Sequence, residues 1–574
     1  MRKLLPFLIF LFLRECFGHG SFAKKPHVIF ILIDDLGFDD LGYVNPDVKS
    51  PNIDYLAKNA LHIDKYYNQP SCTPSRAALM TGRYNIRYGL QSGVIKPDEP
   101  EAIPLSETLL PEAFKQCGYQ TSMHGKWHLG FYTKYHCPQN RGFDRFFGFY
   151  LGSQDYFYHD SGNNCYLYSP CYRGEIEGPP KKMELMEKKI YRPAGFDFRE
   201  VYSNGTEKIR FDLNGTYSTK AIADDFIAKL DDFDPETPLF EFLSFQEVHG
   251  PLQWLPEFST LFKETPWTHY RKMLSRKIAV VDHFIGEIVK ALKEKGFWKD
   301  TLLIITSDNG GQTREGASNW PLRGKKGNIF EGGIRSRAFV HSPKLPESLK
   351  GKSFPYVMHV TDWLPTLLRS AGCEVPPETL PLDGVAQDLF HLRPVPKRSH
   401  LLNFMDPLKR AKRELDSREF QVLSNRTFDV TVKAAIRSEN WKLITGRPCH
   451  WGCSFSQKKN LKYEPDKVAL EDVEEDKLVR LYAITEDEGE RNDVSDSYPE
   501  LVDKFLLKLA DYYDEQVKPQ QEASDPAALP IDGVWRPWRK RETFVYEKLR
   551  KKTVFSNNQA RETDLNYFES TVDK

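Results

Sequence analysis

The chain has 574 residues, of which 40% are hydrophobic and 28% are charged. This composition is ordinary for a globular protein with a large core, and the length is sufficient for more than one domain. The 80 lysines and arginines balance the 80 aspartates and glutamates. Because proteins that bind nucleic acid normally carry a basic excess, we expect no nucleic-acid partner.

The first residues have the pattern of an export signal. Arg2 and Lys3 precede an apolar run at 4–13, and small residues at 21–23 form a plausible cleavage site. The apolar run is too short for a typical transmembrane helix, and no later segment reaches a spanning length. We therefore predict a signal peptide over residues 1–23 and a secretory-pathway protein, lysosomal or secreted, without a transmembrane segment.

Two further features agree with export. Three Asn-x-Thr sequons mark candidate glycosylation sites, which are Asn204, Asn214 and Asn425. Among the nine cysteines, two pairs are close enough in sequence for local disulfides, namely Cys165 with Cys171 and Cys449 with Cys453. An oxidising compartment favours disulfides over a metal knuckle at these positions.

Three continuous apolar runs are typical of strands buried on both faces, and they lie at 27–33, 238–245 and 301–307. Helical patterns lie between them, at 52–60, 105–116 and about 270–295. Strands that alternate with helices predict an α/β fold, in which a large mixed, mostly parallel sheet is flanked by helices.

After about residue 395 the pattern changes. The segments 434–445 and 481–483 are strand-like, and 501–513 is an amphipathic helix pattern. We therefore predict a main domain over 24–395 and a smaller α+β subdomain over 396–540. The charged tail, 541–574, is expected to be solvated and mobile.

Acidic residues follow two of the apolar runs. Asp34 and Asp35 come directly after the first run, and Asp308 and Asn309 come after the third. Because ligands bind at the carboxyl ends of strands in open α/β sheets, we expect one shared site. Adjacent buried carboxylates repel one another and need a cation, and an all-oxygen set favours Ca²⁺ or Mg²⁺ over zinc. The alternative for each pair is a helix or turn cap.

A lone cysteine lies in the sequence Cys-Thr-Pro-Ser-Arg at 72–76, and Thr-Gly-Arg follows at 81–83. Taken alone, Cys72 could be an ordinary buried thiol. Lys126 and His128 are two residues apart, so they would face the same side if this segment is extended.

A second histidine and further lysines could complete a site. His249 follows the second apolar run, and Lys326 lies in a glycine-rich loop. Lysines together with a metal ion are what a tetrahedral oxyanion requires, because they stabilise charge where it develops.

These motifs together resemble the sulfatase family within the alkaline-phosphatase-like superfamily, over about residues 26 to 540. Within the family they are most similar to the branch of arylsulfatase B, an N-acetylgalactosamine-4-sulfatase, and arylsulfatases I and J. The stretches at 125–130 and 319–324 are specific to this branch. The resemblance identifies the predicted main domain as the catalytic domain.

The resemblance also implies a cofactor set. In this family the formylglycine-generating enzyme oxidises the signature cysteine, here Cys72, to formylglycine, and the aldehyde hydrate attacks sulfur. One Ca²⁺ ion would be held by Asp34, Asp35, Asp308, Asn309 and the modified Cys72.

Further roles follow from matching positions. Arg76 would stabilise the hydrate, while Lys126 and Lys326 would bind sulfate; Lys326 is preferred to Lys325 because Lys-Gly-x-x-x-Glu-Gly-Gly is the family spacing. His249 would protonate the departing oxygen and His128 would then take a proton from the hydrate, which expels sulfate. Trp320 is a candidate for stacking on a sugar, with core packing as the alternative.

The function implied is removal of sulfate from sulfated sugars, in particular N-acetylgalactosamine 4-sulfate units of glycosaminoglycans. One alternative is phosphoester hydrolysis on the same fold, although such enzymes use Ser or Thr with a zinc pair. The other alternative is a secreted binder of sulfated glycans in which Cys72 remains a thiol. Several features depart from the family pattern. The segment 91–105 contains no cysteine, Cys117 and Cys137 have no counterparts at their exact places, Gly250 replaces a bulkier residue, and the charged tail beyond Arg539 differs.

Overall fold

The computed structural model describes residues 24–161, 195–391, 394–395, 398–411, 428–449 and 477–540. The predicted signal peptide, the tail 541–574, Asn425, Cys165, Cys171 and Cys453 lie outside these described residues. Among the helices in the described ranges, none combines the length and the apolar character needed to cross a bilayer.

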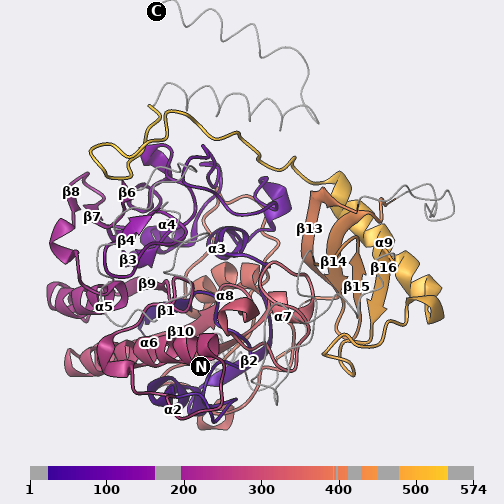
Figure 1. Cartoon of the computed structure of the whole chain (residues 1–574), viewed down its shortest axis with the longest axis horizontal. Coiled ribbons are helices and arrows are strands. Elements are labelled where there is room, and N and C mark those ends of the chain that lie inside the picture. The colour runs from indigo at the N-terminus through magenta and orange to yellow at the C-terminus, as the bar shows by residue number, and fades with distance from the viewer. Residues whose placement is uncertain are drawn as a thin grey trace, which may run out of the picture.

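A ten-stranded sheet runs through the larger part of the molecule, with the order β12-β2-β11-β10-β1-β9-β3-β4-β7-β8 (Figure 1). Its strands are β1 (His27–Ile33), β2 (Leu61–Tyr67), β3 (Gln120–Lys126), β4 (Arg145–Phe149), β7 (Arg199–Tyr202), β8 (Glu207–Ile209), β9 (Leu239–Phe245), β10 (Thr301–Ser307), β11 (Arg335–His341) and β12 (Met358–His359). The five strands from β10 to β4 are mutually parallel, and antiparallel strands flank them. The predicted mixed, mostly parallel sheet is confirmed.

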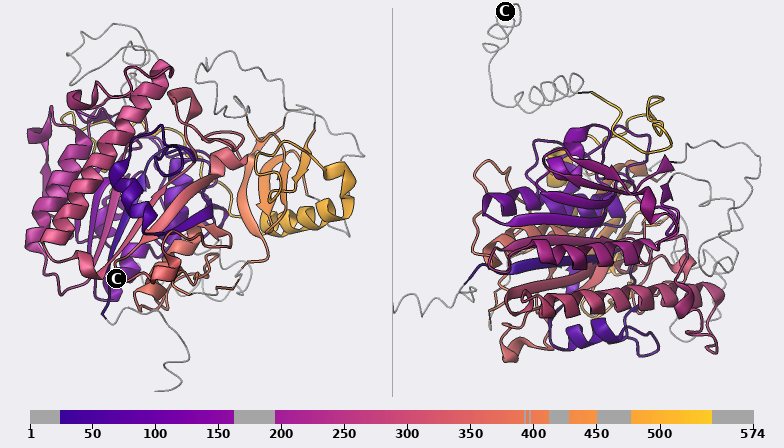
Figure 2. Two further views of the ribbon diagram at one scale, coloured as in Figure 1. Left: turned by 90° about the horizontal axis from the view of Figure 1, so that it is seen from below. Right: turned by 90° about the vertical axis from the view of Figure 1, so that its left-hand side faces the viewer.

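Both faces of the sheet are covered by helices (Figure 2). Alternate residues of β1 enter opposite cores, since Val28, Phe30 and Leu32 pack on one side and Ile29, Ile31 and Ile33 on the other. The first core includes helices α3 (Cys72–Thr81), α4 (Leu110–Gln116) and α8 (Trp363–Ser370). The second includes α2 (Pro51–Lys58), α5 (Ser218–Lys229) and α6 (His269–Glu294). This two-sided burial explains why the central strands are continuous apolar runs.

One predicted helix is shorter than the pattern suggested. The segment 105–116 was expected to be helical, but α4 begins only at Leu110. Pro111 lacks a backbone N–H, so it is tolerated only in the first turn, and Leu109 before the helix is extended. The prediction was therefore wrong for the first five residues.

A second, four-stranded antiparallel sheet follows the first (Figure 1). It contains β13 (Leu401–Arg410), β14 (Val432–Arg437), β15 (Lys442–Thr445) and β16 (Val479–Tyr482), and helix α9 (Pro499–Asp514) packs on it. The predicted single strand segment at 434–445 is two strands, because Ser438 donates its N–H to the carbonyl of Trp441 and closes a hairpin turn.

After α9 the chain returns to the larger sheet. The N–H of Val517 donates to the carbonyl of Ile86 over 2.7 Å. Trp535 is 1% exposed and belongs to the core under the large sheet. The last described residues are thus packed on the larger sheet rather than on the smaller one.

A disulfide joins Cys117, which follows α4, to Cys373, which follows α8, across 256 residues of sequence. Cys449 is also disulfide-bonded. The two described cysteines that remain free thiols are Cys72 and Cys137, and both are buried.

Candidate active site

The predicted acidic residues meet at one edge of the sheet. Ile33 and Ser307 are register partners at the ends of the parallel strands β1 and β10. The residues that follow, Asp34 and Asp308, are therefore placed side by side. The N–H of Asp35 donates to Oδ1 of Asp308 over 3.3 Å, which joins the two strand ends. The expectation of a shared location is confirmed.

These side chains form a group suited to a cation. Asp34, Asp35, Cys72 and Asp308 each place one potential ligand atom within 4.8 Å of the others. Asn309 donates its amide Nδ2 to Oδ1 of Asp35 over 2.7 Å, while its own Oδ1 is buried without a hydrogen-bond partner. An unsatisfied buried oxygen is destabilising, and a bound cation would satisfy it. Three carboxylates and an amide oxygen fit a hard cation such as Ca²⁺.

The two central carboxyl groups differ in their pKa. Burial alone would raise the pKa of Asp34, but Lys126, His249 and Arg76 outweigh burial and hold this pKa well below its usual range. At Asp308 burial dominates, and together with the negative charge of Asp34 it raises the pKa to about 7. The two buried carboxyl groups therefore lie in different electrostatic surroundings, although both contact a cation of the cluster.

Cys72 is the first residue of α3 and is 2% exposed. Its Sγ lies 3.4 Å from Oδ1 of Asp34. Burial, followed by the charge of Asp34, raises the pKa of the Cys72 thiol to about 12. Because the thiolate is the reactive form of cysteine, an unmodified thiol here is a poor nucleophile. The position itself favours anions, since the N-terminus of a helix carries partial positive charge.

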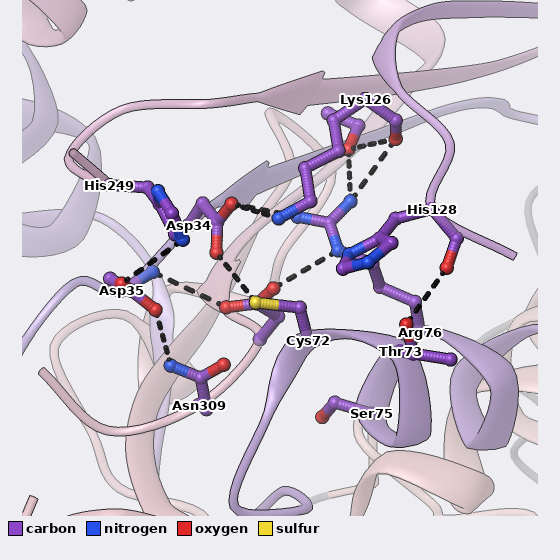
Figure 3. Close-up of polar contacts among 12 residues, drawn as sticks. Asp34, Asp35, Cys72, Thr73, Ser75, Arg76, Lys126, His128, His249 and Asn309 are labelled. Atoms are coloured by element: carbon purple, nitrogen blue, oxygen red, sulfur yellow. Dashed lines mark hydrogen bonds and ion pairs between the residues drawn. The ribbon is translucent and has the colours of Figure 1, made fainter. Parts of the chain in front are cut away.

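Arg76 lies one helical turn after Cys72 and points to the same cluster (Figure 3). Its Nε donates to Oδ2 of Asp308 over 3.0 Å, and Nη1 donates to the carbonyl of Lys126 over 3.1 Å. The third guanidinium nitrogen, Nη2, is buried without a hydrogen-bond partner and lies 3.7 Å from Oδ2 of Asp34. One buried donor therefore remains available beside Cys72.

Two lysines neutralise the acidic pair. Lys126 ends β3 and its ammonium contacts Oδ2 of Asp34 at 2.5 Å. Lys326 contacts Oδ1 of Asp35 at 2.7 Å. Burial lowers the pKa of Lys326, but Asp35 and Cys72 outweigh burial and raise it well above its usual value. Lys326 thus remains a cation at the edge of the cluster.

His128 also lies at this cluster, although not for the predicted reason (Figure 3). Its backbone has a φ of 57°, so the segment is not extended as we had assumed. Gly152 packs against the ring, where a Cβ would approach Cε1 to 2.6 Å. The ring Nδ1 is buried without a partner, and Nε2 lies 3.1 Å from the carbonyl of Ile95. Burial and the charges of Lys126 and Arg76 hold the pKa of His128 well below its usual value, which keeps it neutral.

His249 lies across the cluster, in the loop after β9. Its Nδ1 donates to the carbonyl of Gly250 over 2.8 Å, and Nε2 lies 3.9 Å from Oδ2 of Asp35. The side chain is 18% exposed, so it can be reached from solvent. Burial, then the charge of Lys326, lowers the pKa of His249.

The loop that contains His249 is contacted by Lys277, a residue that the sequence pattern did not identify. The Lys277 ammonium lies 3.4 Å from the centre of the Tyr156 ring and donates to the carbonyl of Pro251 over 3.2 Å. The Tyr156 hydroxyl in turn donates to the carbonyl of His249 over 2.8 Å. A charged residue in the apolar run of α6 is the signal that could have identified it.

We expect Lys277→Met to lower kcat by about 10- to 100-fold, because a misplaced catalytic group has a cost of that order. KM should change less, since Lys277 contacts the His249 loop rather than the acidic cluster. Because the buried carboxylate of Glu247 loses its neighbouring cation, thermal unfolding is measured alongside to separate lost stability from lost positioning. The matched control is Lys290→Met, an exposed position on the same helix. A Lys277 variant that keeps the parent kcat would show that this contact does not position His249.

The remaining predicted residues make no hydrogen bond or ion pair with the cluster among the described residues. Trp320 is half-buried in the loop before Lys326, and within the described chain no hydrogen bond or ion pair links it to the pocket. Asn204 and Asn214 are exposed, as glycosylation requires. Their roles remain predictions.

Comparison with known proteins agrees with this geometry. The family model described as Sulfatase matches residues 26–373. Arylsulfatase J of Mus musculus is 36% identical over 91% of this chain and 81% of its own length. Arylsulfatase A of Homo sapiens is 32% identical over 65% of this chain and 68% of its own length. The crystal structure of Ps i-CgsB in complex with k-i-k-neocarrahexaose has a TM-score of 0.63, is 26% identical and covers 92% of this chain and 97% of that chain.

The fold and the acidic pocket define an alkaline-phosphatase-like hydrolase with one candidate metal site in the described residues. The chain belongs to the sulfatase family, and it is a sulfuric ester hydrolase of the arylsulfatase type.

Proposed function

We propose that this enzyme uses a formylglycine made from Cys72, together with one Ca²⁺ ion, to remove sulfate from sulfated sugars. The observation that carries the proposal is the meeting of Cys72, Asp34, Asp35 and Asp308 within 4.8 Å at the start of α3. The two groups of potential metal ligands in the described ranges both contain Asp34 and Cys72, so they define one site. A zinc pair with histidine ligands, as in related phosphoesterases, is not favoured by this arrangement.

The formylglycine hydrate would supply a nucleophilic hydroxyl and a second hydroxyl through which the sulfate ester is later broken. Asp34, Asp35, Asp308 and Asn309 would hold Ca²⁺, which would supply positive charge to the sulfate oxygens. Arg76 has an unpartnered Nη2 beside Cys72, and it would donate a hydrogen bond there. The formylglycine-generating enzyme of the secretory pathway would be the partner that modifies Cys72.

The two histidines would divide the proton transfers. His249 is partly exposed, and its Nδ1–H already donates to the carbonyl of Gly250. In the doubly protonated imidazolium form its Nε2–H would protonate the departing ester oxygen. His128 is buried and neutral, and its Nδ1 has no hydrogen-bond partner. This nitrogen would accept a proton from the second hydroxyl of the hydrate, the one that does not attack sulfur. Lys126 and Lys326 would bind the sulfate oxygens, which carry the charge that develops.

For the substrate we propose N-acetylgalactosamine 4-sulfate units of glycosaminoglycans, with Trp320 as a sugar contact. The support is the similarity of the motifs to the arylsulfatase B branch. Two exposed sequons and an apolar N-terminal run support export to a lysosomal or extracellular location.

The test is sulfate release from N-acetylgalactosamine 4-sulfate and from the 6-sulfate, measured with protein secreted from a eukaryotic host. We expect kcat/KM to be at least about tenfold higher for the 4-sulfate, a difference of about 1.4 kcal/mol in transition-state binding. Equal rates, or preference for the 6-sulfate, would overturn the substrate proposal and leave the formylglycine mechanism in place.

A further inference from the structure

Two cations near the pocket have no ionic partner in the part of the chain that the structure describes. Lys126 and Lys326 are each paired with an aspartate of the acidic cluster. Lys325 and Arg314, by contrast, make no side-chain hydrogen bond or ion pair with a described residue. Arg314 is exposed, but Lys325 is only 9% exposed. A lysine with so little exposed surface and no ionic partner is unusual, because lysines that are largely buried are normally paired.

The backbone places these two cations beside the reaction site. Lys325 directly precedes Lys326 in the chain, and the N–H of Lys326 donates to the carbonyl of Gly311 over 3.3 Å. The side chain of Asn319 donates to the carbonyls of Gly311 and Gly324, at 3.0 and 3.1 Å. Hydrogen bonds at Gly311 therefore connect the loop that contains Arg314 to the loop that contains Lys325.

The loop of Arg314 also reaches the loop of His249. Arg314 is the central residue of a short 3₁₀ helix, Thr313–Glu315. The carboxylate of Glu315 lies against Gly250, where a Cβ would come within 3.1 Å of Oε2. Arg314 thus lies in a segment that extends between the His249 loop and the Lys325–Lys326 loop.

The electrostatics of Lys325 agree with an unfilled anion site. Burial, followed by the like charges of Arg314 and Lys326, lowers its pKa to about 8. Asp35 and Glu315 oppose this shift, but neither lies within ion-pair distance of the Lys325 ammonium, and Asp35 pairs with Lys326 instead. A bound anion would stabilise the charged form of Lys325 and remove part of the repulsion from Arg314.

We propose that Lys325 and Arg314 form an anion subsite, which binds a second negative group on the sugar next to the one that carries the scissile sulfate. The proposal rests on the proposed function, since it assumes that the ester lies against Cys72. The ligand class is a carboxylate or sulfate of a polyanionic glycan, because a substrate with one sulfate would leave both cations unpaired. The enzyme would then favour anionic oligosaccharides over single sulfated sugars.

The test compares the parent with Lys325→Met, Arg314→Met and the double variant, and 4-methylumbelliferyl sulfate, which carries one negative charge, is the reporter substrate in every assay. A 4-sulfated chondroitin tetrasaccharide is added as competitor, whether or not it is cleaved. We expect its inhibition constant to rise about 10- to 100-fold in the double variant, since hydrogen bonds to charged groups contribute on this scale. Turnover of the reporter should change by less than about threefold, because it offers no second anion to this subsite. Lys49→Met changes an exposed lysine that is distant in sequence from both cations, and as the control it should leave the inhibition constant unchanged.

Two modified competitors identify the anion. If the carboxyl-reduced tetrasaccharide binds the parent weakly, the subsite holds a uronate. If a tetrasaccharide that keeps only the sulfate of its non-reducing-end sugar binds weakly, the subsite holds a second sulfate. An unchanged inhibition constant in the double variant would overturn the subsite, as would an equal loss of reporter turnover. Failure to release sulfate from N-acetylgalactosamine 4-sulfate would instead count against the proposed substrate, and it would leave this competition assay interpretable.

Discussion

Cys72→Ala is expected to abolish sulfate release, with a fall in kcat/KM for p-nitrocatechol sulfate of at least about 10⁴-fold, because the proposed nucleophile is removed. Folding and secretion should persist, since only one buried sulfur atom is lost, at a cost of about 1 kcal/mol. The measurement is steady-state turnover of purified secreted protein, with thermal unfolding to confirm the fold.

Cys137→Ala is the matched control, because Cys137 is the other free, buried cysteine in the described chain. It should retain the parent turnover. Substantial hydrolysis by Cys72→Ala, near the parent rate, would mean that another group attacks sulfur, and the proposed mechanism would have to be abandoned.

The second large effect is expected for Asp35→Asn. Asp35 accepts from the Asn309 amide and pairs with Lys326, but it makes no contact with Arg76, so its loss should leave the core of the pocket intact. Removal of one charged ligand should lower the affinity for Ca²⁺ by at least about 100-fold, since ligand charge sets affinity at such sites. Activity at low Ca²⁺ should fall in parallel and recover in part when Ca²⁺ is added in excess.

Calcium binding to the purified protein by isothermal titration gives a readout that is separate from activity. Asp47→Asn, an exposed aspartate outside the pocket, is the control and should bind as the parent does. If Asp35→Asn binds Ca²⁺ as tightly as the parent, the acidic cluster is not the metal site.

Long apolar runs made the centre of the sheet predictable. The first and third runs, 27–33 and 301–307, coincide with β1 and β10, because strands buried on both faces cannot tolerate polar residues. The acidic residues after them could be assigned to one site for the same reason, since parallel strands end at one edge. The sequence pattern was less informative where chain reversals are local, as at the β14–β15 hairpin.

Other parts of the site depend on contacts that no local pattern encodes. His128 has a left-handed backbone and packs on Gly152, so its orientation follows from tertiary structure rather than from an extended segment. Lys277 acts on the His249 loop through Tyr156, which comes from a distant part of the chain. The disulfide between Cys117 and Cys373 likewise spans too much sequence for spacing to predict it.

The most direct test of the formylglycine proposal is a mass spectrum of the tryptic peptide that extends from Tyr66 to Arg76, from protein secreted by a eukaryotic host. A peptide whose mass is lower by the change from thiol to aldehyde, and which resists alkylation at Cys72, is the predicted result. A peptide of unmodified mass with an alkylatable Cys72 thiol, in protein that still hydrolyses sulfate esters, would contradict the proposal.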